Sequence, residues 1–384
     1  MKIGIVGGGP AGLFFAYLMK RADASHQVRL FERDSENTTY GWGLVFSDVA
    51  MAFVRDVAPE LHQAITHSQM VHRDMAVVHR DTPVRLANNT FHRIARIDLL
   101  RTLHRYCSNV GVELYFECRI DGMGDISNCD LVDAADGAHS ATRAGLAEHF
   151  EPTLDVRPNW LAWYATTQLF GPLSLIFRKT TNGLFIAHAY QFSETLSTFL
   201  VECDPTTFRT AGLERMSESQ SLRCCEQVFE HDLGGRKLIS NASRWFHYTI
   251  VRNRHWHWQN VVLLGDALRT GHPSVGSGTR MAMQDSIVLF EAWQRCGEDV
   301  PRLLADFERS RRPGSDKLQH AALRSTEWYE SLEPKLALDP VSFAYDYMLR
   351  CGRVDHAEVR RRDPELAAAY EGLHPELAIG GGAP

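Results

Sequence analysis

The sequence predicts an α/β fold, and three observations support this prediction. Near the N-terminus a glycine-rich turn connects an apolar strand to a helix, and a second strand follows. From about residue 160 the apolar residues alternate, as in half-buried antiparallel strands. After residue 310 the chain is polar and helical in character. We therefore expect a Rossmann-like βαβ fold, an inserted antiparallel-sheet domain (an α+β insert) and C-terminal helices.

The composition is that of an ordinary globular protein. The 384 residues are 44% hydrophobic and 23% charged, which excludes a disordered chain, a collagen and a coiled coil. The net charge of −6 makes non-specific binding to nucleic acid or to a membrane surface unexpected. Glycines interrupt the uncharged stretch 3–19, which argues against a signal peptide and favours a cytoplasmic protein. The eight cysteines have no zinc-site spacing, so no metal is expected.

The N-terminal turn has the sequence Gly-Gly-Gly-Pro-Ala-Gly and follows the strand 2–6. Gly7 permits the tight turn, Gly9 lets a pyrophosphate approach the backbone, and Gly12 lets the helix pack on the strand. The phosphates would lie at a helix N-terminus, where free N–H groups favour anions. The second strand ends at Glu32, 20 residues after Gly12, where a carboxylate can accept hydrogen bonds from ribose hydroxyls.

Two later strands end in acidic turns. A helix expected at 96–110 precedes a strand that ends at Asp136-Gly137. The apolar run 261–264 has the composition of a strand buried in a parallel sheet and ends at Gly265-Asp266. A glycine-rich loop and a helix at about 279–295 follow. A carboxylate at a strand end suits the recognition of hydroxyl groups, so both turns are candidates for contact with the same ligand.

The alternating region predicts three successive antiparallel strands, at 173–178, 183–192 and 196–203. In the middle strand the side chains of Leu184, Ile186, His188 and Tyr190 project to one face. The expected domains are a discontinuous nucleotide-binding domain (1–70, 95–155 and 250–310), a substrate-binding β-sheet domain (71–94 and 156–249) and a C-terminal helical region (311–384).

Three motifs far apart in the chain match one family. They are GGGPAG with Glu32, ADGAHSATR around Asp136, and GDALRTGHPSVGSG from Gly265. With the Arg-x-x-Leu-x-x-x-Leu stretch at Arg96, they resemble the single-component FAD-dependent aromatic hydroxylases, typified by para-hydroxybenzoate hydroxylase. The resemblance covers essentially residues 1–310. It implies that FAD is bound by Gly7, Gly9, Pro10, Ala11, Gly12, Glu32, Arg33, Arg96, Asp136, Gly137, Gly265, Asp266, Pro273, Gly276 and Gly278.

The resemblance also implies a role for each motif. Glu32 would hold the adenosine ribose, and the glycine loop the pyrophosphate. Arg96 would reach the ribityl–pyrophosphate side, and Asp266 the ribityl hydroxyls. Asp136 would contribute to FAD or NAD(P)H binding, with a surface-turn acid as the alternative. NAD(P)H would reduce the FAD, and O₂ would then give a flavin C4a-hydroperoxide that hydroxylates an electron-rich aromatic ring.

A narrower resemblance concerns the segments 41–48, 186–203, 243–253 and 261–287. They are similar to a subgroup that includes salicylyl-CoA 5-hydroxylase, 2-aminobenzoyl-CoA monooxygenase and the indole hydroxylase of violacein biosynthesis. The implied substrate is an aromatic acyl-thioester or an indole or tryptophan-derived compound. Leu268-Arg269 replaces the Ala-His that the acyl-CoA members usually carry, which leaves both substrate classes open.

His188, Tyr190 and His272 are the candidate catalytic residues. A side chain that accepts a proton from a ring hydroxyl or amino group would activate the ring. His188 and Tyr190 share the strand face that would line the substrate pocket, and His272 lies in the flavin-side loop. For all three, an ordinary role in packing or in shaping the loop is the alternative hypothesis.

Other functions are also open at this point. The alternatives are a flavoprotein epoxidase or reductase, and a non-catalytic FAD-binding protein. The expected partners are a small aromatic substrate, O₂ and NAD(P)H; the oligomeric state is left open, with a homodimer as one candidate. Short basic clusters at 309–312 and 360–364 are expected to be solvated helix faces, with contact to phosphates of CoA or NADPH as the alternative.

Overall fold

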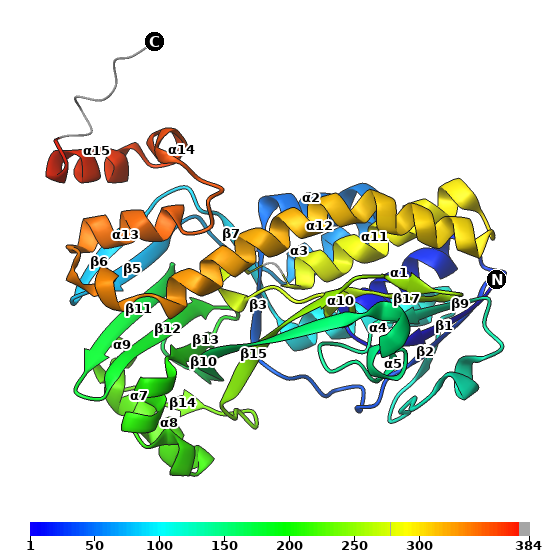
Figure 1. Ribbon diagram of the computed structural model, residues 1–384, viewed down its shortest axis with the longest axis horizontal. Coiled ribbons are helices and arrows are strands. Elements are labelled where there is room, and N and C mark those ends of the chain that lie inside the picture. Colours follow the sequence, from blue (N-terminus) through cyan, green and yellow to red (C-terminus); the bar gives the residue numbers. More distant parts are fainter. Residues whose placement is uncertain (277, 376–384) are drawn as a thin grey trace.

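The structure is a computed structural model that describes residues 1–276 and 278–375. Figure 1 shows two parts, one built on a parallel sheet and one on a largely antiparallel sheet. The long helix α12 (Val300–Glu330) runs across both parts. The expected combination of a Rossmann-like fold with an antiparallel-sheet insert and C-terminal helices is confirmed.

The first part contains a six-stranded sheet with the order β16-β17-β9-β1-β2-β8. All pairs are parallel except β16 with β17. Because parallel strands end at the same edge, the turns that follow β1, β2, β9 and β17 lie at one edge of this sheet. The strands are β1 (Lys2–Val6), β2 (Gln27–Phe31), β8 (Glu113–Tyr115), β9 (Leu131–Ala134), β16 (His257–Trp258) and β17 (Val261–Leu263).

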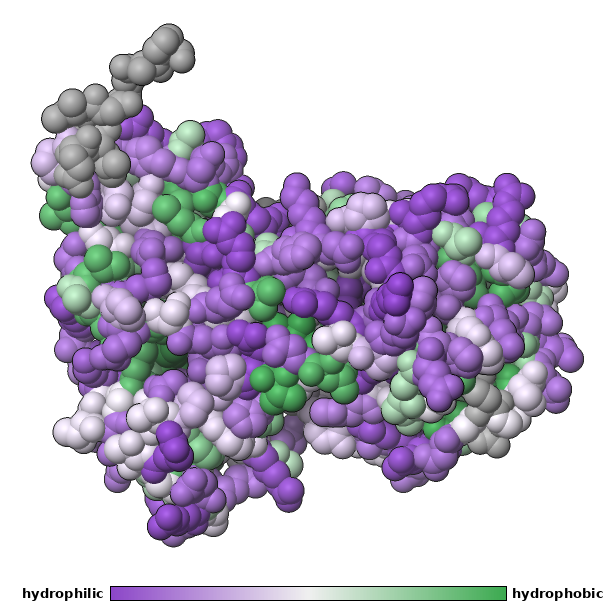
Figure 2. Space-filling view, in the orientation of Figure 1, coloured by the Kyte–Doolittle hydropathy of each residue, from purple (hydrophilic) through white to green (hydrophobic). Residues whose placement is uncertain are grey.

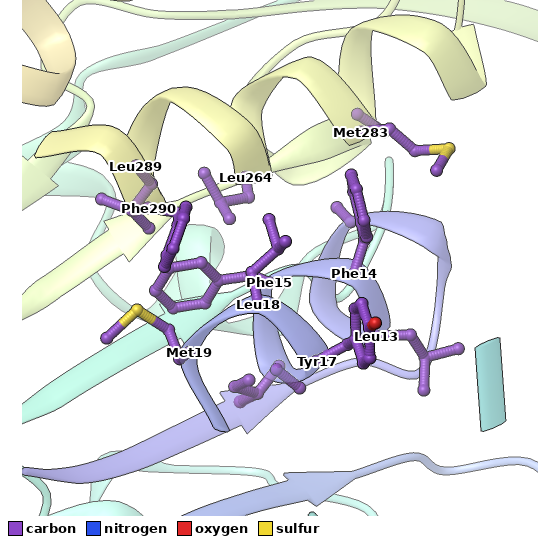
Figure 3. Close-up of a cluster of buried hydrophobic side chains, with 14 of the residues drawn as sticks. Leu13, Phe14, Phe15, Tyr17, Leu18, Met19, Leu264, Met283, Leu289 and Phe290 are labelled. Atoms are coloured by element: carbon purple, nitrogen blue, oxygen red, sulfur yellow. The ribbon is translucent and has the colours of Figure 1, made fainter. Parts of the chain in front are cut away.

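The helix after β1 lies in the middle of the first core. All residues from Pro10 to Met19 of α1 (Pro10–Ala22) are buried, as expected for a helix that is apolar on every side. Phe15 lies beside Phe290, and Phe14 points toward Met283, both on α11 (Figure 3). The other helices of this part are α2 (Asp48–Val57), α3 (Pro59–His67), α4 (Arg96–Val110), η1 (Met123–Ile126), α5 (Ala141–Gly145), α6 (Ala147–Phe150), α10 (Gly265–Leu268), η3 (Pro273–Val275) and α11 (Gly278–Cys296).

The second part is built on a sheet with the order β14-β10-β13-β12-β11-β5-β6, and β15 pairs with β10. The pairing is antiparallel except for β11 with β5. The three strands expected in this region correspond to β11, β12 and β13. The strands are β5 (Met75–His79), β6 (Thr82–Leu86), β10 (Pro152–Thr166), β11 (Leu173–Thr180), β12 (Gly183–Gln191), β13 (Ser197–Cys203), β14 (Leu238–Ile239) and β15 (Phe246–Asn253).

Two features show how the parts are joined. The strands β3 (Gly43–Ser47), β7 (Phe91–Ala95) and β4 (Met70–His72) form a separate three-stranded sheet. Because β4 and β7 contain the two ends of the segment 71–94, only β5 and β6 of that segment enter the large sheet. The pair β10–β15 runs from Pro152–Asn253 to Leu161–Phe246 and so crosses the expected boundaries near residues 155 and 250. The division into domains stays a prediction.

Helices cover both faces of the large sheet. One face, with Phe185 and Phe199, packs against α7 (Pro205–Thr210), η2 (Leu213–Arg215), α8 (Glu218–Val228) and α9 (Glu230–Leu233). The other face, with Phe177 and Ile186, packs against α12 and the helices that follow it. Those are η4 (Glu333–Ala337), α13 (Pro340–Leu349), α14 (His356–Arg362) and α15 (Pro364–Leu373).

The surface agrees with the balanced composition. On the face shown in Figure 2, polar side chains cover most of the molecule and apolar side chains gather in small separate patches. In the described part of the chain, every helix is too short or too polar to span a bilayer.

Candidate active site

The turn after β1 leaves room for a ligand at one glycine and has none at two others. Gly7 has φ +108°, and a Cβ there would lie 2.3 Å from the Ala135 carbonyl oxygen. A Cβ on Gly12 would lie 2.3 Å from the Gly7 carbonyl oxygen, so only glycine lets α1 approach β1 this closely. Nothing lies within 4 Å of the Cβ position of Gly9. No described side chain caps α1, so the N–H groups of its first turn, after Pro10, remain available to an anion.

The carboxylate of Glu32 is held at this turn. Gly8 N–H donates to Glu32 Oε2 (2.6 Å), and Asp34 N–H donates to Oε1 (2.9 Å). The side chain therefore lies beside the glycine loop. The neighbouring Arg33 has a largely exposed side chain 3.7 Å from Asp34.

The Asp136-Gly137 turn after β9 is linked to the motif after β17. Thr142 donates to Asp136 Oδ2 from its backbone N–H and from its hydroxyl, both at 3.1 Å. The other oxygen, Oδ1, is buried and has no hydrogen-bond partner in the described part of the chain, so it is an unpaired acceptor. Arg143 donates to the Ala138 and Ala267 carbonyl oxygens (2.5 and 2.9 Å), which ties the two motifs together.

Asp266 and Arg96 come from different motifs and are electrostatic neighbours. The side chain of Asp266 has solvent-accessible surface, but protein atoms surround it. The surrounding protein raises the pKa of this carboxyl, and the positive charges of Arg96 and Arg269 oppose the rise. Burial lowers the pKa of the Arg96 guanidinium, and Asp266 opposes that change. Arg96 also donates from Nε to Thr39 Oγ1 (3.1 Å). The pair presents an accessible carboxylate and a cation at the edge of the parallel sheet.

A buried ion-pair network supports the Gly265 turn. Gly265 N–H donates to Asp285 Oδ2 (3.2 Å), and Arg269 donates to both oxygens of Asp285 (2.5 and 2.9 Å). Arg311 Nε adds a fourth hydrogen bond to this carboxylate, at 2.8 Å from Oδ1. Arg269 is one of the two positions at which the sequence departs from the acyl-CoA members. Its side chain is paired with Asp285 inside the core. Asp285 was not expected, because it lies a full 20 residues further along the chain, on α11.

The loop that follows contains Pro273, Gly276 and Gly278. Pro273 begins η3, Gly276 follows η3 with φ +56°, and Gly278 begins α11 with nothing within 4 Å of its Cβ position. Ser277 lies outside the described residues. His272 is the residue directly before η3, so it is part of this loop.

A histidine and a carboxylate form the buried polar centre of the large sheet. His188 Nε2 lies 3.2 Å from Glu202 Oε2 on the adjacent strand, and Asn159 Nδ2 donates to the other oxygen of Glu202 (2.8 Å). Burial would raise the pKa of Glu202, but the hydrogen bond from His188, nearby His272 and the bond from Asn159 hold it below its ordinary value. Glu202 is therefore an ionised carboxylate with no exposed surface.

His272 approaches the same centre from the loop. Its ring centroid lies 6.1 Å from that of Tyr329 on α12, and the ring of His188 lies 5.2 Å from the same tyrosine. Tyr248 on β15 packs edge-on against His272 at 5.3 Å. Burial lowers the pKa of His272 to about 4, so its imidazole is neutral near pH 7.

Tyr190 shares a strand with His188 but lies in a different cluster. Its hydroxyl donates to the Gly43 carbonyl oxygen (2.7 Å), and its ring packs with Trp42 and Phe192. Burial raises the pKa of Tyr190 to about 12. The structure brings His188 and His272 together, whereas the phenol of Tyr190 is engaged with β3.

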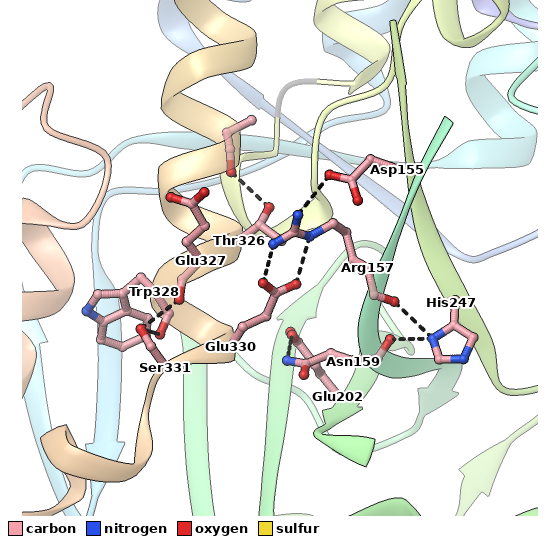
Figure 4. Close-up of polar contacts among 11 residues, drawn as sticks. Asp155, Arg157, Asn159, Glu202, His247, Thr326, Glu327, Trp328, Glu330 and Ser331 are labelled. Atoms are coloured by element: carbon pink, nitrogen blue, oxygen red, sulfur yellow. Dashed lines mark hydrogen bonds and ion pairs between the residues drawn. The ribbon is translucent and has the colours of Figure 1, made fainter. Parts of the chain in front are cut away.

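Figure 4 shows how β10 and α12 meet beside this centre. Arg157 donates to Asp155 and, through two nitrogens, to Glu330 of α12, while Asn159 points toward Glu202. Glu202, Asn159 and Tyr329 were not expected from the sequence. The one local sign was Glu202 itself, a carboxylate inside the otherwise uncharged strand 197–203. Asn159 and Tyr329 belong to elements far away in sequence.

The basic clusters are already paired. Arg361 and Arg362 bond Glu358, and Arg360 bonds Glu371. Arg309 and Arg312 likewise pair with Asp306 and Glu308. Among residues 1–276 and 278–375, no three His, Cys, Asp or Glu side chains are arranged to hold a metal ion.

Comparison with sequence families gives two matches. The FAD binding domain family matches residues 108–322, and an NAD(P)-binding Rossmann-like domain matches residues 5–40. The first match covers more than half of the chain and includes two of the three motifs described above.

Several proteins are similar over most of their length. Salicyloyl-CoA 5-hydroxylase of a Streptomyces species is 34% identical over 91% of this chain and 70% of its own length. Protodeoxyviolaceinate monooxygenase of Chromobacterium violaceum is 33% identical, over 91% and 94% respectively. A 3-hydroxy-4-methyl-anthranilyl-[aryl-carrier protein] 5-monooxygenase of Streptosporangium sibiricum is 34% identical, over 86% and 90%.

The fold is also similar to that of a solved structure. A 2-methyl-3-hydroxypyridine-5-carboxylic acid oxygenase superposes with a TM-score of 0.73 over 95% of this chain and 96% of that chain. The two sequences are 16% identical, so this likeness concerns the fold.

Proposed function

Because the chain belongs to the FAD-dependent aromatic monooxygenases, we propose that it hydroxylates an aromatic ring that carries a hydroxyl or amino group beside a carbonyl group. FAD is the cofactor and NAD(P)H the reductant of this family. The observation that carries the proposal is the opposite hydrogen-bonding character of the two histidines beside Tyr329.

His188 offers an acceptor. An ionised carboxylate only accepts hydrogen bonds, so the bond to Glu202 must be donated by an N–H at Nε2 of His188, and the tautomer of His188 that this bond selects has its proton on Nε2. The Nδ1 atom then carries a lone pair, and it has no hydrogen-bond partner in the described part of the chain. Such a nitrogen can accept the proton of a ring hydroxyl or amino group, which makes the ring more electron-rich.

His272 offers a donor. Ser274 N–H donates to His272 Nδ1 (3.3 Å), and a backbone N–H cannot accept in return. The proton of neutral His272 is therefore on Nε2. A donor of this kind suits the carbonyl oxygen of a substrate.

The two histidines together match a ring with a donor group next to a carbonyl. Salicyloyl and anthranilyl groups, which appear in the names of two of the relatives, have this arrangement. A ring with only one of the two groups would leave one imidazole nitrogen unpaired in a buried site, which costs binding energy. An indole compound, suggested by the third relative, would engage His188 through its N–H.

The residues of the first part fit FAD. Gly7, Gly9, Pro10, Ala11 and Gly12 would hold the pyrophosphate, and Glu32 the ribose. Arg96 and Asp266 would meet the ribityl side, and the unpartnered oxygen of Asp136 would accept a further hydrogen bond. FAD, when reduced, supplies the activation of O₂, while the protein orients the ring and excludes water. The homodimer and the cytoplasmic location stay predictions.

The proposal is tested with purified, FAD-loaded protein and NADPH in air. Thioesters of 2-hydroxybenzoate and 2-aminobenzoate are compared with those of 4-hydroxybenzoate and unsubstituted benzoate, and with indole-3-pyruvate. We expect hydroxylated product, detected by mass spectrometry, and the fastest NADPH oxidation with the two ortho-substituted thioesters. An equal response to benzoyl thioester, or a response to the indole compound alone, would overturn the substrate assignment.

Variants test the role of the histidine. His188→Ala should lower kcat about 100-fold or more, because the proton acceptor is lost. Glu202→Gln should have a smaller effect and shift the pH profile of kcat, because the amide no longer fixes the tautomer of His188. His231→Ala, at an exposed histidine of α9, is the matched control. Unchanged kcat in His188→Ala would rule out this role.

A further inference from the structure

Arg350 connects the C-terminal helices to the loop that carries His272. It lies at the end of α13, and its guanidinium donates to the Ser274 carbonyl oxygen (3.1 Å) and to Ser325 Oγ (3.0 Å). A third bond, to the Tyr347 carbonyl oxygen (2.9 Å), fixes the side chain on its own helix. Arg350 thus joins α12, α13 and the η3 loop.

Two serines continue from Arg350 to His272. Ser325 Oγ, which lies on α12 and is fully buried, is 2.8 Å from Ser274 Oγ. Ser274 Oγ is 2.9 Å from His272 Nδ1. The four side chains therefore form one hydrogen-bonded chain, which ends at the imidazole beside Tyr329.

The chemistry of the groups gives this chain a direction. A guanidinium only donates hydrogen bonds, so Ser325 Oγ accepts one from Arg350. The hydroxyl of Ser325 can then donate its own hydrogen bond to Ser274 Oγ. Ser274 Oγ can then donate to His272 Nδ1. The Ser274 backbone N–H points to the same nitrogen and agrees with this direction, because it also can only donate.

We propose that Arg350 is a positioning residue that, through Ser325 and Ser274, holds His272 in the tautomer with its proton on Nε2. The inference rests on the proposed role of His272 as the donor to the substrate. It assigns to the C-terminal helices a part in preparing the active site, although Arg350 does not itself contact substrate or FAD in this proposal.

The proposal also explains why a cation, Arg350, stands at the end of the hydrogen-bonded chain opposite His272. The charge of Arg350 orients both hydroxyls in one direction, which neutral hydroxyls would not do alone. Without this charge, the hydroxyls of Ser325 and Ser274 could point the other way, and Ser274 Oγ could accept a hydrogen bond from an Nδ1–H of His272. The Ser274 backbone N–H would remain as a fixed donor to Nδ1, so the Nε2–H tautomer of His272 would still be favoured, but the share of the Nδ1–H tautomer would rise.

The test is the tautomer itself, observed by ¹⁵N NMR of the imidazole nitrogens in the FAD-loaded protein, with His272 assigned by its absence in His272→Gln. We expect a single Nε2–H form in the original protein. Arg350→Met and Ser325→Ala should each lower the ratio of Nε2–H to Nδ1–H by about fivefold or more, the effect of one lost hydrogen bond. Arg350→Lys, which keeps the charge and a donor, should restore part of the ratio.

Three features keep the result clear. Ser325→Ala removes one hydroxyl and is expected to fold even if Arg350→Met does not. Arg353→Met, at an exposed arginine three residues further on, is the matched control and should leave the tautomer unchanged. An Nδ1–H form in the original protein, or an unaltered ratio in both Ser325→Ala and Arg350→Met, would overturn the inference. Because this measurement needs no substrate, its failure is distinguishable from failure of the substrate assignment.

Discussion

The dinucleotide loop and the pair of histidines are built in different ways. The loop after β1 depends on backbone shape, because Gly7 and Gly12 leave no space for a Cβ and Gly9 leaves open space for a ligand. The histidines depend on side chains from several elements, since Glu202 orients His188 and Ser274 orients His272. A site made by the backbone is local in sequence, whereas a site made by side chains is assembled only by the fold.

The two regions also differ in what they leave unpaired. The loop leaves N–H groups at the start of α1 for a ligand, and Asp136 keeps one buried oxygen without a partner in the described part of the chain. In the histidine pair, each ring has one nitrogen held by protein, and the other nitrogen is the one that we propose meets the substrate. In our proposal the first region binds through the shape of its backbone, and the second through the direction of its N–H groups.

The largest expected effect comes from a substitution in the glycine loop after β1. Gly12→Val should abolish FAD binding or folding, because even a Cβ would lie 2.3 Å from the Gly7 carbonyl oxygen and 2.9 Å from Ile5. The visible flavin absorption and the CD spectrum of the purified protein measure this. Gly122→Val is the matched control, because nothing lies within 4 Å of its Cβ position. A normally folded, FAD-loaded Gly12→Val protein would refute the placement of the pyrophosphate.

This difference explains what could be predicted from the sequence. The βαβ unit and the strand-end acids were predictable, because glycine spacing and apolar strands fix them within short segments. The facing of His188 on β12 followed from strand alternation. The partners Glu202, Asn159 and Tyr329 could not be predicted, because their approach depends on β13, β10 and α12 meeting in space.

The second prediction concerns the histidine region and pH. The pKa of His272 is lowered from 6.5 to about 4 by burial, so the folded state favours the neutral ring. Its contribution to stability is complete above pH 6.5 and is lost as the pH falls toward 4, by up to about 3 kcal/mol. Chemical unfolding at pH 7.5 and 4.5 should show a smaller acid loss in His272→Gln than in the original protein. Equal losses in the two proteins would contradict this, and the exposed His139→Gln is the control.

The third prediction concerns the place where the two regions meet. Asp266→Ala should weaken FAD binding by about 5- to 150-fold, the loss of 1–3 kcal/mol for an acceptor of ribityl hydroxyls. Fluorescence titration of apoprotein with FAD measures the Kd. Asp56→Ala, at an exposed carboxylate 3.4 Å from Arg55, should leave the Kd unchanged. An unaltered Kd in Asp266→Ala would remove Asp266 from the cofactor site and leave the glycine loop as the main anchor.

The smallest expected effect lies outside both regions and tests whether charge alone marks a site. Arg361 is largely exposed and pairs with Glu358, which Arg362 also bonds. Because exposed pairs contribute little and these charges are already matched, Arg361→Ala should leave the Tm unchanged and the KM for NADPH within about twofold. Steady-state kinetics at low ionic strength, where charge effects are strongest, is the sensitive measurement. A large rise in KM that disappears at high salt would show that this helix face contacts phosphate, and that a paired surface cluster can serve binding as the buried histidines are proposed to do.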